Sequence, residues 1–124
     1  MIRAADFQRR LRPLLPEADG WATRGKLTYR SPAEWVATGV FAESSGYLRD
    51  HLYIWVACVP LFVPLEHLAL DHSWRVFNGS TPIAFDDEPA LSETLARAVR
   101  DVPSVDQALN RIASSEAEAS SYAL

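Results

Sequence analysis

The most apolar run of the chain extends from residue 52 to residue 59 and contains neither charge nor glycine. β-Branched and aromatic residues dominate it, and its length is typical of a strand. Alternate side chains of a strand point to opposite faces. One face then carries Leu52, Ile54, Val56 and Cys58, and the other Tyr53, Trp55, Ala57 and Val59. Because both faces are apolar, both need cover, which helices supply on one side and more of this chain or a partner on the other.

Pro60 and Pro64 follow this run and end the strand, because proline cannot donate a hydrogen bond to a ladder. Alternation resumes over residues 67–77 and predicts a second strand, paired antiparallel with the first at the centre of one sheet. A cluster of turn residues, Asn78, Gly79, Ser80 and Pro82, ends it.

Weaker patterns predict the elements before this pair. Residues 2–15 have the apolar spacing of an amphipathic helix, which Pro13 should kink or shorten. Strands are expected over residues 21–30 and 34–41, and Gly39 in the second leaves room for a large neighbour to pack over it. A polar loop over residues 43–50 is expected to join this strand to the central one as a hairpin.

The last third of the chain is predicted to be helical after a short edge strand at residues 83–85. Acids before Pro89 indicate a helix start, and Pro103 should stop that helix. Ser104 and Gln107 have the spacing of a capping box that opens a second helix. The expected apolar faces are Leu91, Leu95, Val99 and Val102 in the first helix, and Val105, Leu109, Ile112 and Ala113 in the second.

This order predicts an α+β fold with an N-terminal helix, an antiparallel sheet of three to five strands and two C-terminal helices. With 124 residues and no internal repeat, residues 1–124 are expected to form a single domain. A domain cut from a longer protein is the alternative.

Charge is distributed unevenly along the chain. Residues 1–82 hold nine basic and eight acidic side chains, a net charge of +1, and residues 83–124 hold three and eight, a net charge of −5. An acidic balance argues against general nucleic-acid binding, which usually needs a basic excess. If the protein binds nucleic acid, the candidate residues are a basic set: Arg9, Arg10, Arg12, Arg24, Lys26 and Arg30.

No run is long enough for a membrane-spanning helix, and the N-terminal residues have no apolar stretch typical of a signal peptide. The single cysteine, Cys58, cannot form an internal disulfide and is interpreted as a small core residue. These observations predict a cytoplasmic protein without a membrane partner.

Residues with catalytic or metal-binding chemistry form no recognised motif. A metal site built from His51, Glu66, His67, Asp71 and His72 would need ligands converging at about 2 Å, whereas strand neighbours two apart lie about 6.6 Å from each other. Ser44 and Ser45 lack the pattern of a nucleophile elbow, and Glu43 and Asp50 are interpreted as solvated loop acids. We therefore expect no catalytic residue, no metal and no cofactor.

Aromatic residues are concentrated on the predicted strands. The candidate ligand or partner face consists of Tyr29, Trp35, Tyr53, Trp55, Trp74 and His67. The leading hypothesis is a non-enzymatic module that binds a protein partner, or itself as a homo-oligomer, through an apolar sheet face or edge. The alternative is a small-ligand or enzymatic pocket lined by these aromatics with a histidine, His67 or His51.

The favoured interpretation of these aromatics themselves is a core beneath the helices. On that view Trp55 is buried, and Trp55→Ala costs roughly 3–5 kcal/mol. The competing view makes Trp55 an exposed anchor and leaves the core to Leu52, Ile54 and Val56.

Several short segments of the sequence resemble a group of uncharacterised bacterial proteins that share a domain of unknown function. The segments are His51-Leu52-Tyr53-Ile54-Trp55, Pro60-Leu61-Phe62-Val63-Pro64, Glu66-His67-Leu68 and Trp74-Arg75, within residues 1–80. The resemblance implies a bacterial cytoplasmic protein and carries over no activity, cofactor or site residue.

Overall fold

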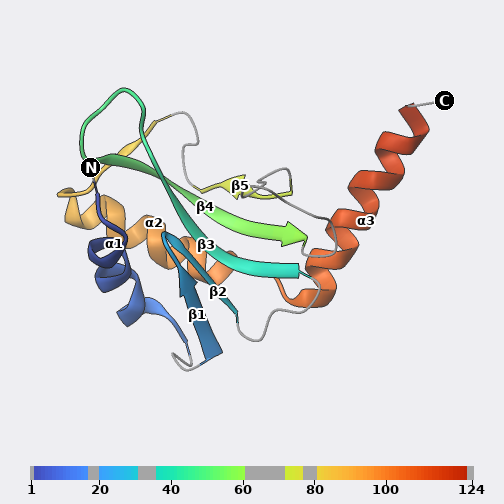
Figure 1. Cartoon of the computed structure of the whole chain (residues 1–124), viewed down its shortest axis with the longest axis horizontal. Helices are drawn as coiled ribbons and strands as arrows, with labels where there is room; N and C mark the ends of the chain where they lie inside the picture. Colours follow the sequence, from blue (N-terminus) through green and yellow to red (C-terminus); the bar gives the residue numbers. More distant parts are fainter. Residues whose placement is uncertain (1, 17–19, 31–35, 61–71, 77–80, 123–124) are drawn as a thin grey trace.

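A computed structural model describes residues 2–16, 20–30, 36–60, 72–76 and 81–122, with side chains described as far as residue 114. Helices and an antiparallel sheet form the α+β fold that the sequence predicts (Figure 1). The helices are α1 (Ala4–Leu11), the 3-10 turn η1 (Arg12–Leu14), α2 (Glu88–Asp101) and α3 (Val105–Tyr122). The strands are β1 (Trp21–Arg24), β2 (Leu27–Arg30), β3 (Val36–Ser44), β4 (His51–Pro60), β5 (Trp74–Arg75) and β6 (Ile83–Ala84). None of the described helices has the length and hydropathy that crossing a membrane requires.

The described strands are in the order β1-β2-β3-β4-β5, and β6 also pairs with β4. There are six of them rather than three to five because the segment expected as one strand over residues 21–30 is a hairpin. Gly25, at φ +61°, begins the two-residue turn between β1 and β2. Glycine adopts this left-handed conformation without steric cost, which is why tight hairpin turns select it.

β4 lies inside the sheet as predicted, but its long partner is β3. The two strands pair from Val36 opposite Pro60 to Ser44 opposite Leu52. β3 therefore ends three residues later than expected, and the predicted loop shrinks to residues 45–50. Within residues 67–77, expected to form the second central strand, the structure describes the short strand β5. This strand lies at the edge of the described sheet and not at its centre. Residues 67–71 lie outside the described part of the chain.

On the edge of β4 that faces away from β3, the backbone hydrogen-bonding groups find three kinds of partner along the strand. β6 pairs with His51 and Leu52, and β5 pairs with Trp55 and Val56. Further along, the Ser73 hydroxyl oxygen accepts from the Cys58 backbone N–H at 2.8 Å. The Ser73 side chain, just before β5 begins, thus supplies the hydrogen-bond acceptor that a neighbouring strand would otherwise provide.

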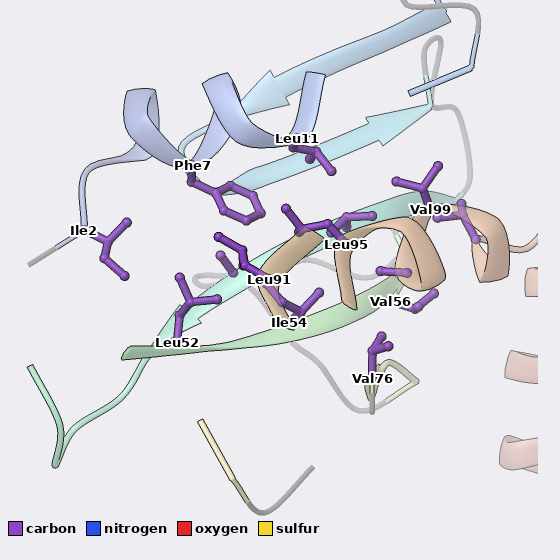
Figure 2. Packing of buried hydrophobic residues seen from close by; sticks show 14 residues of the cluster. Ile2, Phe7, Leu11, Leu52, Ile54, Val56, Val76, Leu91, Leu95 and Val99 are labelled. Carbon is purple, nitrogen blue, oxygen red and sulfur yellow. The ribbon is translucent and has the colours of Figure 1, made fainter. Parts of the chain in front are cut away.

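The main core lies between the helices and one face of the sheet (Figure 2). Phe7 and Leu11 of α1 and the predicted stripe of α2 pack there against alternate residues of β4. The labelled members are Ile2, Phe7, Leu11, Leu52, Ile54, Val56, Val76, Leu91, Leu95 and Val99. A buried hydrogen-bonded pair also joins α1 to the hairpin: Thr28 donates to Gln8 Oε1 at 2.6 Å.

α3 covers the same face of the sheet further along. Ala108 and Ile112 pack on Val36 and Cys58, so Cys58 is the core residue that the sequence predicts. The expected capping box is present, with Ser104 N–H donating to Gln107 Oε1 and Gln107 N–H to Ser104 Oγ. Two residues expected on the apolar face, Val105 and Ala113, are exposed because a narrower stripe than predicted contacts the sheet.

Candidate interaction surface

The sheet face opposite the helices carries the side chains of odd-numbered residues on β3 and β4. Directly opposed residues of paired strands share a face, and the register places Phe41 opposite Trp55, Glu43 opposite Tyr53 and Trp55 opposite Arg75. These five residues, Phe41, Glu43, Tyr53, Trp55 and Arg75, form what we call the Arg75 cluster.

Arg75 is the centre of this cluster. Its guanidinium carbon lies 3.9 Å from the centroid of the Tyr53 ring and 5.2 Å from that of Trp55. Its Nη2 donates to Glu43 Oε1 at 3.0 Å, and Trp55 Nε1 donates to the same oxygen at 3.3 Å. A cation thus lies over two aromatic rings, with a carboxylate shared between the guanidinium and the indole.

The Arg75 cluster remains accessible to a partner. The Arg75 and Glu43 side chains are 35% and 37% exposed, and Phe41, Tyr53 and Trp55 are partly exposed. Beside it lies a small apolar cluster on the same face, against which Tyr29 and Phe41 pack. Its buried members are Leu27, Ala37, Ala57 and Val59.

The structure brings together three of the six residues of the candidate face. Tyr29, Tyr53 and Trp55 share the face opposite the helices, whereas Trp74 does not. Trp74 lies opposite Val56, packs against the helix-side core and has the Arg111 guanidinium carbon 4.5 Å from its ring centroid. Neighbouring strand residues point to opposite faces, so Trp74 and Arg75 are separated by the sheet. Trp35 and His67 lie outside the described residues.

Three members of the cluster, Phe41, Glu43 and Arg75, are not in the candidate face that the sequence predicts. Glu43 was interpreted as a solvated loop acid, but it lies within β3 and forms the ion pair with Arg75. Arg75 has the opposite parity to Trp74, which is the signal that places it on this face. The expectation that Trp55 is buried is wrong, because the described helices pack on the other face and leave Trp55 partly exposed.

The remaining sequence candidates do not gather into a site among the described residues. These residues contain no group of three metal-ligating side chains. Burial raises the pKa of the Cys58 thiol, which nearby Arg111 opposes in part. In the basic set, Arg9 pairs with Asp6 and Arg10 with Glu88, so acidic neighbours offset part of its charge.

Comparisons of the chain with models of protein families, with curated proteins and with solved structures found no match. The resemblance to bacterial proteins with a domain of unknown function therefore stays a prediction.

Proposed function

We propose that the protein is a non-enzymatic interaction module that binds through the Arg75 cluster. The observation that carries this proposal is the asymmetry of the sheet. α1, α2 and α3 pack on one face, while the other presents partly exposed aromatic rings around an arginine.

The composition of the cluster supports binding to a protein. Tyrosine, tryptophan and arginine are the residues most enriched among those that dominate interface energies. The aromatic residues lie on the two longest of the described strands, and Arg75 is held by Glu43 and by the rings beneath it. Side chains that are already ordered lose less conformational entropy on binding, which favours affinity.

The partner we propose is a second copy of this chain. Glu43 and Arg75 lie side by side, so the surface is complementary in charge to itself when two copies meet about a two-fold axis. Such an interface is isologous, with each Arg75 facing the partner's Glu43. Cytoplasmic location belongs to the same proposal, and the single buried Cys58 is compatible with a reducing compartment.

Sedimentation equilibrium tests this proposal. Wild type is expected to dimerise reversibly, and Arg75→Glu is expected to dissociate the dimer because like charges then face each other. The pair Arg75→Glu with Glu43→Arg should recover association. Arg100→Glu makes the same charge change on the exposed side of α2 and should leave association unchanged. A wild-type protein that stays monomeric at all concentrations would overturn the proposal.

The pocket alternative is not proposed further. It requires Trp74 beside Tyr53 and Trp55, and the sheet separates Trp74 from the other two. Of its two histidines, His67 lies outside the described residues, and His51 directs Nδ1 at the Arg49 carbonyl oxygen, 2.8 Å away.

A further inference from the structure

α3 is held to the sheet by fewer described side chains than α2. Within residues 105–114, Ala108 and Ile112 are buried one helical turn apart, and Leu109 is partly buried. The buried set of α2 is longer: Leu91, Thr94, Leu95, Ala98 and Val99. Figure 1 shows the C-terminal turns of α3 extending away from the strands. The described contact between α3 and the sheet is therefore made by the N-terminal half of the helix.

The apolar residues beneath α3 form a cluster of their own. Val36 and Cys58 pack with Ala108 and Ile112, and this cluster shares no described residue with the main core that α1 and α2 cover. Loss of the α3 contacts would therefore leave the main core intact. A segment with few buried apolar contacts opens locally at a lower free energy than unfolding of the whole chain requires.

The other interactions of α3 are local or exposed to water. The capping box of Ser104 and Gln107 fixes the first turn from within the helix itself. Arg111 adds a link to the strand segment, with Nε donating to the His72 carbonyl oxygen at 3.0 Å and the guanidinium over the Trp74 ring. Arg111 is exposed, so water competes for both interactions and they hold α3 weakly.

The Thr38 hydroxyl favours release of α3. Thr38 lies opposite Cys58 on the helix side of the sheet, between Val36 of the α3 cluster and Val40 of the main core. Its side chain is 1% exposed, and its hydroxyl has no hydrogen-bond partner among the described residues. A buried hydroxyl without a partner costs stability. Water that enters when α3 leaves can hydrogen-bond to this group, which lowers the free energy of the open state relative to the closed one.

We propose that α3 is a detachable cover that opens as a unit while the main core stays folded, and that it controls access to Cys58, the only thiol of the chain. In the closed state the Cys58 side chain is 0% exposed and burial raises its pKa, so the thiol is shielded and protonated. A detached helix of 18 residues is only marginally stable in water, so α3 unwinds when it opens. The cover lies on the sheet face opposite the Arg75 cluster and does not depend on it.

Labelling of Cys58 with an aromatic disulfide reagent tests the proposal. The Cys58 thiolate attacks the reagent, forms a mixed disulfide and releases a coloured aryl thiolate, which gives the rate. At low reagent concentration this rate follows the equilibrium fraction of open molecules. Ala113→Gly weakens α3 at an exposed position, and Ala96→Gly makes the same change at an exposed position of α2.

Ala113→Gly should raise the labelling rate in the absence of urea about fivefold, which corresponds to the helix-forming cost of glycine relative to alanine. Ala96→Gly should leave this rate unchanged, because α2 stays folded in both the closed and the open state. Urea melts establish that both variants fold and that their global stability falls to a similar extent. Equal acceleration by the two variants would overturn the proposal, since Cys58 would then be reached by unfolding of the whole chain. Acceleration by neither variant would also overturn it, since the reagent would then reach Cys58 by another route.

Discussion

Gly39 of β3 lies so close to Thr28 of β2 that a Cβ on the glycine would overlap the Thr28 carbonyl oxygen. The same Cβ would lie 2.7 Å from the Cα of Tyr29, which is opposite Gly39 in the register. The space over the glycine, expected to admit a large side chain, is occupied by the backbone of the neighbouring strand. Glycine is thus required for β2 and β3 to approach each other here.

Gly39→Ala is therefore expected to destabilise the fold by at least about 1–3 kcal/mol, the usual cost of overpacking. The strand must move, since the obstructing atoms are backbone. Urea unfolding measures the change. Gly46→Ala is the control, because a Cβ there meets nothing within 4 Å and should leave the midpoint almost unchanged. Equal midpoints for the two variants would contradict the close approach.

Gln8→Ala should cost about 1–3 kcal/mol because it leaves the buried Thr28 hydroxyl without its acceptor. The same variant removes the donor to the Gly25 carbonyl, where Gln8 Nε2 lies at 3.2 Å. The double variant Gln8→Leu with Thr28→Val should lose less stability than the sum of the losses from Gln8→Leu alone and Thr28→Val alone. Denaturant melts of wild type, these two single variants and the double variant give the coupling energy between the two side chains. Strictly additive losses would argue against the hydrogen bond.

Ile54→Ala is expected to destabilise the protein by about 2–5 kcal/mol, since Ile54 is 1% exposed in the helix-side core. Trp55→Ala should cost less stability than Ile54→Ala because part of the Trp55 side chain already contacts water. Urea melts of both variants measure the two losses of stability. A larger loss for Trp55 would restore the view that it belongs to the core.

Stability should fall as the pH rises past the ordinary pKa of a cysteine, about 8.5. Burial raises the pKa of Cys58 in the folded state, so the unfolded chain releases this proton first and is favoured at alkaline pH. The stability that the buried neutral thiol of Cys58 contributes is fully present below the cysteine pKa of the unfolded chain. It is lost as the pH rises towards the higher pKa of Cys58 in the folded state. Melts of wild type and Cys58→Ala between neutral and alkaline pH test this, and the variant should show a smaller decline.

Local patterns were sufficient for much of the fold. The apolar stripe of α2, the Ser104 capping box and the alternation along β4 depend on residues within a few positions of one another. The turn at Gly25 was missed although glycine is its usual signal, because the apolar and polar alternation continues on both sides of it. The late end of β3 was missed because Ala42, Glu43 and Ser44 are held by pairing with β4 rather than by their own propensities.

Period and chemistry along the chain thus determined most of the helices and strands, though not all of their limits, and which side chains alternate with which. The assignment of faces and partners came from packing between distant segments. Glu43 and Arg75 are 32 positions apart and meet because β3 and β5 pair with β4 in particular registers. Trp55 and Trp74 have similar chemistry, yet the helices bury one face of the sheet and leave the other partly exposed, which gives the two tryptophans different environments. A linear pattern defines two faces for each strand, and only the packed helices distinguish the face that becomes core from the face that stays available for binding.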